Sequence, residues 1–578
     1  MLSTRFVSLR NLLLALAVTS VLVGCAQLPT DVQRPVSSAL ASPQGTALDA
    51  LVKARRETGN GRAASGFMLL PTPQTAYGSR LALVDAAQKT LDLQYYAIHA
   101  DASTERLLRA VLAASQRGVR VRILLDDFHG TGRNALVMRL GFEPNIEMRM
   151  FNPLAGARGS SIGRMVNAIG DFNRAQQRMH NKLFIADNAM AVTGGRNLGD
   201  AYFGIAQTRN FVDLDVLTAG PIVQNLSASF DQYWNNERAY PVQSLVTREE
   251  LKDIRDKTIV AEKTRTDREN TANDGSPGNN AKAAPEGTTG DGGKLPDGEP
   301  RPSDAGPTDA QRTAAWDQKP LDLRQASFVW APAVVMADKP AKIPVEDTEA
   351  ASESETVVDG LLNLIAQSRE DLLIISPYFV PGPDMLQAFA TARARGVKVR
   401  VLTNSLASND APVAHAGYAR HREKLLALGI EIYELRSEQS GLGSAFGSSG
   451  SSGTASSGSS PAGSSGIGDS RAMLHSKVLV MDKRLVVIGS MNLDQRSQLQ
   501  NTEIALLIRS AALAHQVAAE IDPTMSNGAW HVELVDGRLV WHAPQGSNLP
   551  DATHDPDTSL GLRMLLKVFG PLAPEELL

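Results

Sequence analysis

The chain alternates short apolar runs with amphipathic stretches, and one such arrangement occurs twice. In the first copy, an apolar run at residues 91–96 is followed by a helical pattern, a glycine turn and a second apolar run at residues 117–124. The second copy has the same order, with its apolar runs at residues 372–379 and 395–402. A strand, a helix and a second strand form a βαβ unit with parallel strands. The copies lie about 280 residues apart, far beyond the period of a solenoid, so the pattern predicts two homologous α/β domains.

The shifts in composition along the chain suggest where these domains begin and end. We assign the first domain to residues 76–245 and the second to residues 325–578, with a stem and a leading helix at residues 25–75. Residues 246–324 are predicted to form a disordered polar linker, because their long Gly-, Pro- and Asp-rich tract cannot bury enough apolar surface to fold. Residues 441–468 are dominated by Gly and Ser and are predicted to form a flexible loop in the second domain.

The N-terminus has the pattern of an export signal that ends at the chain's single cysteine, Cys25. Residues 12–23 are apolar but too few to span a bilayer comfortably, which is typical of a signal peptide. Gly24 before Cys25 resembles a bacterial lipoprotein lipobox, so residues 1–24 would be removed and Cys25 would be diacylated. Two or three acyl chains hold a protein firmly on a membrane surface. We therefore expect a lipoprotein of the bacterial cell envelope that faces the periplasm; the alternative is an ordinary signal peptide with an incidental cysteine.

Composition and charge narrow the class of protein. Hydrophobic residues make up 43% of the chain, as in ordinary globular proteins. The formal net charge is -4, with 58 basic and 62 acidic residues, so no broad positive potential indicates a nucleic-acid binder. A single cysteine excludes an intramolecular disulfide framework and a thiolate-rich metal site.

Each half carries a histidine and a lysine two residues apart, then an aspartate, then a glycine-containing loop that ends in asparagine. The first set is His180, Lys182, Asp187, Gly195 and Asn197, and the second is His475, Lys477, Asp482, Ser490 and Asn492. Side chains alternate along a strand, so the histidine and lysine of each set face the same side. An imidazole, an ammonium group and amide donors suit a phosphate group. Two copies that face each other would enclose one phosphodiester.

The duplication makes this pattern specific. One histidine, lysine and aspartate at this spacing should arise by chance in roughly one chain in fifty, and two copies with identical loop spacing are far rarer. A metal site is disfavoured, because lysine is not a usual ligand and no carboxylate lies at a ligand spacing from His180 or His475. We expect neither a metal nor another cofactor.

Two further carboxylates, Asp213 and Glu503, follow the histidines at similar distances in the two halves. Asp213 and Glu503 each precede a predicted strand, and we expect them to orient the imidazoles, since a carboxylate on the second ring nitrogen fixes the tautomer. The alternative for each is a charge at a strand edge. Asp187 and Asp482 are counted with the catalytic motifs, although their position at a turn favours a role in bracing the loop.

The two motifs resemble those of the phospholipase D superfamily. Residues 177–204 and 402–420 are similar to bacterial cardiolipin synthases, the C-type subgroup in particular, and the resemblance covers about residues 76–245 and 325–578. It implies an α/β fold of two phospholipase D-like α-β-α domains with mixed sheets, related by a pseudo-twofold axis and sharing one active site. The long linker, the Gly/Ser loop and the lipobox depart from the family pattern.

The resemblance also implies a metal-independent phosphatidyl transfer in two steps. One imidazole would attack phosphorus and form a phosphohistidine, while the other would protonate the leaving alcohol and later deprotonate the incoming one. By analogy, His180 is expected to be the nucleophile. Lys182 and Lys477 would neutralise the phosphate oxygens, and four loop residues would add hydrogen bonds. Those four are Gly195, Asn197, Ser490 and Asn492.

The resemblance further implies phospholipid substrates, namely phosphatidylglycerol and, as a second candidate, phosphatidylethanolamine. A membrane surface reached through the lipid anchor is the expected partner; an accessory protein stays open, and no nucleic acid is expected. The main alternative is a phospholipase D hydrolase that uses water as the acceptor and releases phosphatidate. A nucleic-acid phosphodiesterase is disfavoured by the net charge, and a lipoprotein scaffold without catalysis is disfavoured because both motifs are intact.

Overall fold

The structure is a computed structural model, and it describes residues 27–59, 62–156, 158–159, 171–273, 306–343, 356–437 and 471–570. The signal segment 1–24, Cys25 and the Gly/Ser loop at 441–468 lie outside the described residues, so what the sequence predicts for them stays a prediction. Among the described residues, no helix is both long and apolar enough to cross a bilayer.

Within the described residues, the first domain is built on a mixed sheet of nine strands. In order across the sheet these are β10 (Val329–Trp330), β1 (Gly66–Leu70), β8 (Asp215–Ala219), β6 (Met190–Gly194), β5 (Leu183–Ala186), β2 (Thr90–Tyr95), β3 (Arg120–Asp126), β4 (Ile146–Phe151) and β9 (Ala239–Pro241). Strands β2, β3 and β4 are parallel, and the other neighbours are antiparallel. The domain starts with β1, ahead of the predicted boundary at residue 76.

The second domain repeats this sheet, again with nine strands in the part of the chain that is described. Their order is β11 (Ala333–Ala337), β20 (Ile504–Arg509), β18 (Leu485–Gly489), β17 (Val478–Met481), β12 (Asp371–Ile375), β14 (Lys398–Asn404), β15 (Glu431–Leu435), β21 (Ala529–Val535) and β22 (Arg538–His542). Here β12, β14 and β15 form the parallel part. Since β8 to β4 and β20 to β15 follow the same order and directions, the prediction of two homologous α/β domains with mixed sheets is confirmed.

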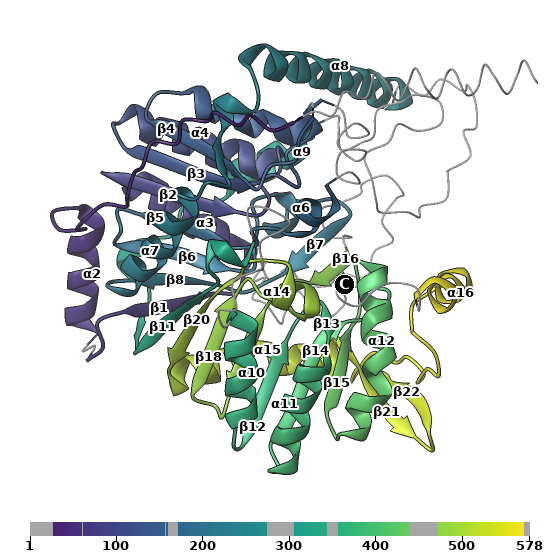
Figure 1. Cartoon of the computed structure of the whole chain (residues 1–578). Helices are drawn as coiled ribbons and strands as arrows, with labels where there is room; N and C mark the ends of the chain where they lie inside the picture. Colours follow the sequence, from purple (N-terminus) through teal and green to yellow (C-terminus); the bar gives the residue numbers. More distant parts are fainter. Residues whose placement is uncertain are drawn as a thin grey trace, which may run out of the picture.

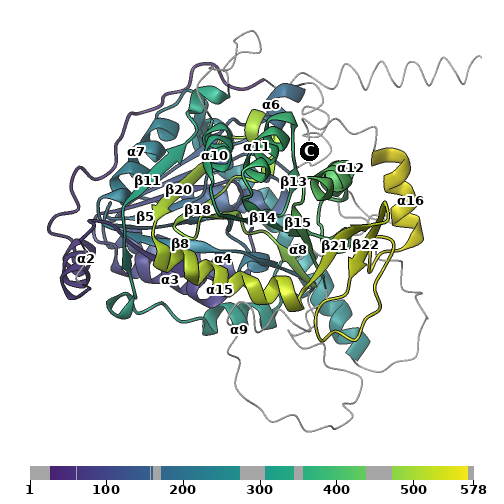
Figure 2. The ribbon, with the colours of Figure 1, turned by 90° about the horizontal axis from the view of Figure 1, so that it is seen from below.

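Helices pack on both faces of each sheet (Figure 1, Figure 2). One apolar cluster joins the first sheet to α3 (Pro73–Ala86) and α4 (Ala102–Gln116). A second cluster joins the second sheet to α10 (Val357–Gln367), α11 (Pro383–Ala394) and α12 (Pro412–Ala427). A third cluster contains residues of both sheets together with α7 (Ile222–Trp234) and α15 (Ala511–Asn527). The two domains therefore share one core.

Strand β5, which follows His180 and Lys182 directly, is buried along its whole length. Leu183 and Ile185 belong to the shared core, whereas Phe184 and Ala186 pack into the cluster under α3 and α4. A strand that is apolar on both faces is typical of a central position in a sheet. This burial fixes the register, because a slip of one residue would turn every side chain to the opposite face.

The segment just after residue 325 serves both sheets. Strand β10 pairs with β1 in the first sheet, whereas β11, only two residues further on, pairs with β20 in the second. The backbone N–H of Arg509 donates to the carbonyl of Pro332 between them. The predicted start of the second domain at residue 325 therefore needs correction, since residues 329–330 complete the first sheet.

The prediction of a disordered linker at residues 246–324 is wrong for two segments that form helices, while residues 274–305 lie outside the described residues. These helices are α8 (Arg248–Asn273) and α9 (Asp309–Asp317). Leu251 and Ile254 lie one turn apart on α8 and are buried in the core of the first domain. A few apolar residues at helical spacing suffice to dock a polar helix on a domain that already exists, and a composition average over the whole tract misses them.

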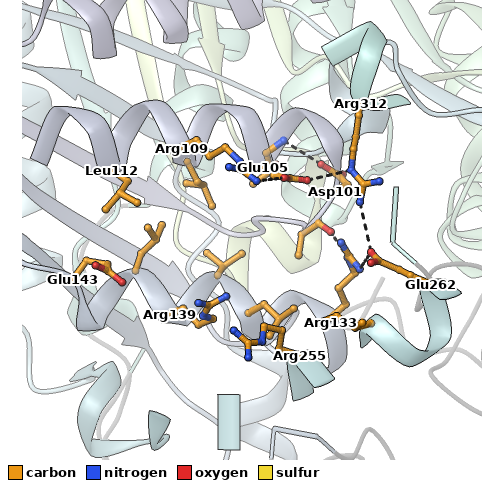
Figure 3. Close-up of a pocket in the computed structure, with 17 residues that line it drawn as sticks. Asp101, Glu105, Arg109, Leu112, Arg133, Arg139, Glu143, Arg255, Glu262 and Arg312 are labelled. Atoms are coloured by element: carbon orange, nitrogen blue, oxygen red, sulfur yellow. Dashed lines mark hydrogen bonds and ion pairs between the residues drawn. The ribbon is translucent and has the colours of Figure 1, made fainter. Parts of the chain in front are cut away.

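Charged side chains also tie α8 and α9 to the first domain (Figure 3). Glu262 on α8 lies 2.8 Å from the guanidinium of Arg133 and 3.7 Å from that of Arg312 on α9. These pairs border a cavity of about 530 Å³ whose wall includes Leu108 and Leu136. None of the residues that line this cavity belongs to either histidine motif, so it is separate from the candidate site.

Candidate active site

His180 meets Glu503 across the interface between the domains. Met179 and Thr502 form a parallel bridge, and the backbone N–H of His180 donates to the carbonyl of Thr502 at 2.9 Å. The residues that follow this bridge on the two segments are His180 and Glu503, so their side chains lie together. Nδ1 of His180 is 3.0 Å from each carboxylate oxygen of Glu503.

His475 meets Asp213 through the matching arrangement. Strand β16 (Arg471–Leu474) of the second domain pairs in parallel with β7 (Arg209–Val212) of the first, with Leu474 opposite Val212. The next residues along the two strands are His475 and Asp213, and Nδ1 of His475 is 2.7 Å from Oδ2 of Asp213. The prediction that Asp213 and Glu503 orient the imidazoles agrees with this geometry, with one addition: each carboxylate serves the histidine of the other domain.

This crossed pairing brings both motifs into one site. A carboxylate on Nδ1 holds the proton there and leaves Nε2 with a lone pair directed away from it. Burial first, and then the charges of Lys477, Lys182 and His180, hold the pKa of His475 well below its ordinary value, as expected when the two motifs lie close together. We conclude that the two motifs form one shared site.

The two imidazoles are neutral near pH 7 before a substrate binds. Burial lowers the pKa of His180 to about 4, although Glu503 opposes this effect. For Glu503 itself burial favours the neutral acid, but His180 and Lys182 outweigh it and hold the pKa at about 2. The carboxylate that faces His180 is therefore ionised, which makes the imidazole a better nucleophile. An anionic phosphodiester would in turn favour protonation of a neighbouring imidazole.

The two lysines are buried beside the imidazoles. The ammonium group of Lys182 donates to the carbonyl of His180, and that of Lys477 to the carbonyl of His475, each at 2.6 Å. An ammonium group has three donors, so each lysine retains two for another acceptor. Burial lowers the pKa of Lys182 to about 7 and that of Lys477 to about 8. A bound anion would therefore stabilise the charged form of both ammonium groups, which is what the sequence predicts for a phosphate site.

Aromatic rings line both sides of the histidine cluster. The ring of Tyr96 meets the edge of His180 at a centroid distance of 5.1 Å. Tyr202 and Phe211 lie 5.3 and 4.9 Å from His475. No role for Tyr202 or Phe211 is predicted from the sequence. Phe211 had a usable signal, because it lies two residues before Asp213 on an extended segment and therefore faces the same side.

Asp187 and Asp482 lie outside the site, so their grouping with the catalytic residues needs correction. Asp187 follows the far end of β5 and accepts hydrogen bonds from three backbone N–H groups, at residues 88–90. Asp482 accepts from the N–H groups of residues 369–371 in the same way. Both carboxylates brace the turn after a motif strand, the role that their position in the sequence favoured.

The four residues predicted to bind phosphate have different contacts in the structure. The hydroxyl of Ser490 donates to Glu503 at 2.5 Å, so it holds the carboxylate rather than a ligand. A Cβ at Gly195 would lie 2.5 Å from Oδ1 of Asp213, so this glycine makes room for the carboxylate. The amide of Asn197 is bonded to Ala97 N–H and to the hydroxyl of Tyr202.

Asn492 is the member of this set whose side chain is best placed for a ligand. Its backbone N–H donates to the hydroxyl of Ser497, but its buried Oδ1 atom has no hydrogen-bond partner among the described residues. A buried amide oxygen without a donor is costly, and a hydroxyl group of a substrate in reach of Oδ1 would satisfy it.

A further carboxylate lies on the His475 side of the site. Asp410 accepts a hydrogen bond of 2.7 Å from the hydroxyl of Tyr378. Its charge opposes the effect of burial on the pKa of Lys477. On the His180 side, the ring of Tyr96 stacks instead on the exposed Phe128. The two sides of the site thus differ, with the carboxylate of Asp410 on the His475 side and the exposed ring of Phe128 on the His180 side.

Comparison with known proteins links this geometry to a family. A family model described as "Cardiolipin synthase, PLD-like domain" matches residues 81–234 and 361–525, and each matched segment contains one histidine motif. Cardiolipin synthase C of Escherichia coli (strain K12) is 33% identical over 533 residues, which cover 89% of this chain and 96% of that protein. Cardiolipin synthase A of Yersinia pseudotuberculosis serotype O:3 (strain YPIII) is 22% identical over 503 residues, which cover 84% of this chain and 75% of that protein.

A solved structure has the same fold. The crystal structure of phosphatidylserine synthase from Haemophilus influenzae Rd KW20 aligns with a TM-score of 0.52 and 14% sequence identity. The alignment covers 91% of this chain and 100% of that one. At this identity the likeness bears on the fold alone, and it extends over both domains.

Proposed function

Because the chain belongs to the family of cardiolipin synthases with phospholipase D-like domains, we propose that it is a phosphatidyltransferase that joins two phospholipids through a phosphohistidine. The observation that carries the proposal is the crossed pairing of His180 with Glu503 and of His475 with Asp213. Two neighbouring imidazoles oriented by carboxylates supply the nucleophile and the general acid for one phosphodiester. The substrates are phosphatidylglycerol and, as a second candidate, phosphatidylethanolamine.

In the first step, Nε2 of His180 attacks phosphorus and forms a P–N bond. The bond between phosphorus and the head-group oxygen breaks, and His475, which takes up a proton from solvent when the anionic substrate binds, gives that proton to the leaving alkoxide. Glycerol leaves when the donor is phosphatidylglycerol, and ethanolamine leaves when it is phosphatidylethanolamine. Ionised Glu503 supports this assignment, because it stabilises the positive charge that develops on His180.

In the second step, the now neutral His475 takes a proton from a hydroxyl of the acceptor phospholipid. The acceptor oxygen attacks phosphorus, the P–N bond breaks, and His180 is neutral again. The product of two phosphatidylglycerol molecules is cardiolipin. Lys182 and Lys477 are proposed to hold the non-bridging oxygens in both steps, with the Nδ2 amide group of Asn492 as a further donor, because charge on these oxygens must be neutralised during phosphoryl transfer.

The main alternative is hydrolysis, in which water replaces the acceptor lipid. Only 7% of His180 and 6% of His475 is exposed to solvent. A site that excludes water favours an alcohol acceptor that brings its own binding energy. This burial therefore supports transfer over hydrolysis.

We further propose that the enzyme is a lipoprotein of the bacterial cell envelope, anchored through a diacylated Cys25 and facing the periplasm. The lipobox-like residues before Cys25 support this proposal, as does the lipid substrate. Mass spectrometry of the N-terminal peptide from membranes tests it. The expected peptide begins at an acylated Cys25, and a free cysteine within an uncleaved chain would contradict the anchor.

A product assay in mixed micelles tests the reaction. The mature protein is incubated with labelled phosphatidylglycerol, with and without phosphatidylethanolamine, and the products are identified by mass spectrometry. Cardiolipin is expected, and it should be absent with His180→Ala and with His475→Ala. Ethanolamine release would identify phosphatidylethanolamine as the second substrate. Phosphatidate as the main product would instead identify a hydrolase, and cleavage of an oligonucleotide without turnover of either lipid would identify a nuclease.

A further inference from the structure

The helix α16 (Leu560–Phe569) presents an apolar face to solvent. Four large apolar side chains on this helix are between 53% and 67% exposed: Leu560, Met564, Leu565 and Val568. Their spacing places them along one side of the helix. Isolated apolar residues on a surface are ordinary, but a contiguous group on one helix face marks a surface that binds a partner.

The C-terminal end of α16 holds it against the second domain. Arg420 on α12 donates a hydrogen bond to the carbonyl of Gly570, directly after the last helical residue. A Cβ at Gly570 would lie 3.0 Å from the side chain of Ala416 on α12. Figures 1 and 2 both show α16 at the edge of the molecule, beside α12 and the β21–β22 hairpin. The helix is therefore fixed at its end on α12, while the four apolar side chains remain exposed to solvent.

The charges of α16 are all positive. Arg563 and Lys567 lie next to each other one turn apart, and the helix contains no acidic residue. The chain as a whole carries a net charge of -4, so this helix is a local exception. An apolar face flanked by basic side chains is the arrangement that lies in the interface of a bilayer with anionic head groups.

The place of α16 in the fold connects it to the active site. Helix α12, on which α16 packs, begins at Pro412, two residues after Asp410. Asp410 is bonded to Tyr378, and its charge acts on Lys477. Val413 in the first turn of α12 is itself 51% exposed and adds to the apolar surface near the site.

We propose that α16 docks on the surface of a phospholipid bilayer, with Leu560, Met564, Leu565 and Val568 inserted at the boundary between head groups and acyl chains. Arg563 and Lys567 then contact anionic head groups. This contact holds α12, and with it the Asp410 side of the active site, next to the lipid surface. The inference stands on the surface of α16, and neither the lipid anchor nor the proposed reaction is needed for it.

A fluorescent probe on α16 tests the docking directly. Cys25 is the chain's single cysteine, so full-length Cys25→Ser/Met564→Cys can be labelled at residue 564 alone with a polarity-sensitive dye. Vesicles that contain phosphatidylglycerol should shift the emission to the blue and raise its intensity. The matched control is Cys25→Ser/Val334→Cys, labelled at an apolar residue of the second sheet that is also exposed. Its emission should stay unchanged.

The outcomes separate a bilayer from other partners. Adding Arg563→Gln and Lys567→Gln to the residue-564 probe should weaken its response to anionic vesicles about 10- to 30-fold, because each basic residue near an anionic surface adds about 1 kcal/mol. No response to vesicles at residue 564 would overturn the proposal. A blue shift that appears without vesicles and grows with protein concentration would overturn it too, since it would identify a second copy of the chain as the partner.

Activity provides an independent readout of the same surface. A variant with Leu560, Met564, Leu565 and Val568 all changed to Gln should turn over vesicle substrate at least 10-fold more slowly. It should keep the wild-type rate on short-chain phospholipids below their critical micelle concentration. Equal rates on vesicles would contradict the docking, whereas an inactive wild type with a responsive probe would contradict only the proposed reaction.

Discussion

Nδ1 of His180 lies 3.0 Å from the carboxylate of Glu503, a residue 323 positions further along the chain and in the other domain. The corresponding contact joins His475 to Asp213 at 2.7 Å over 262 positions in the opposite direction. Each carboxylate therefore serves the histidine of the domain that does not contain it. The active site is complete only when the two domains are assembled.

The crossed pairing predicts selective effects on the two rings. Glu503→Gln removes the negative charge and introduces an amide N–H that can donate to Nδ1 of His180, so the proton on that ring should move to Nε2 while the tautomer of His475 stays unchanged. Asp213→Asn should change the tautomer of His475 and leave that of His180 unchanged. Nitrogen-15 NMR of histidine-labelled protein reports which ring nitrogen carries the proton. The rate should fall about 10²- to 10⁴-fold in each variant, as expected when an orienting carboxylate is lost. A change in the ring of the same domain would contradict the crossed arrangement.

The nucleophile can be identified with a substrate whose leaving group needs no acid. With phosphatidyl-p-nitrophenol, His475→Asn should release about one equivalent of p-nitrophenol in a burst, because His180 still forms the P–N bond. His180→Asn should show no burst. The covalent adduct should be found on the peptide that contains His180 after acid-free digestion. The reverse pattern would assign the nucleophile to His475.

The dependence of kcat/KM on pH should be bell-shaped, and its alkaline side should combine loss of the proton on His475, whose pKa is lowered by burial and by the neighbouring lysines, with loss of the lysine charges. The pKa of about 4 for His180 means that the ring is protonated below pH 4, so the nucleophile and the rate are lost as pH falls. The pKa values of about 7 and 8 for Lys182 and Lys477 mean that their positive charges are lost as pH rises through this range, and phosphate binding weakens. Lys182→Arg stays charged and should move the alkaline limb upward. An alkaline limb that does not move would exclude Lys182 as its cause.

Asp187 should matter for folding rather than for chemistry. Asp187→Ala leaves three backbone N–H groups near residues 88–90 without their acceptor and should lower the free energy of unfolding by about 3 kcal/mol. Asp482→Ala, at a less buried site, should lower it by about 1 kcal/mol. Denaturant unfolding measures both values. Activity per folded molecule should stay within about threefold of wild type, and a loss comparable to that of His180→Ala would restore Asp187 to the catalytic group.

The sequence predicted which residues carry the chemistry of the site, but it did not predict which carboxylate contacts which histidine. The duplicated spacing of histidine and lysine identified His180 and His475, because alternation along a strand is a local property. Asp213 and Glu503 were identifiable as orienting groups by their position before a strand. Their exchange between domains depends on the pairing of β7 with β16 and of Met179 with Thr502, and no local pattern encodes contacts between segments that far apart.

The errors at the domain boundaries have a similar origin. The composition of residues 246–324 is that of a disordered segment, yet Leu251 and Ile254 are enough to hold α8 on the first domain. Residues 329–337 form two short strands, and a short apolar run does not reveal which of two sheets it will join. In both places the partner surface, rather than the segment's own composition, decides the structure.

The exchange of carboxylates also changes how fragments and truncated gene products should be judged. A polypeptide that ends before residue 500 retains His180, Lys182 and the whole first motif, yet it lacks Glu503, the group that prepares His180 for attack. A motif search would score the first motif of such a fragment as intact, although the carboxylate that pairs with His180 is missing. In this architecture, the presence of a histidine motif is evidence for activity only when the carboxylate from the other half of the chain is present as well.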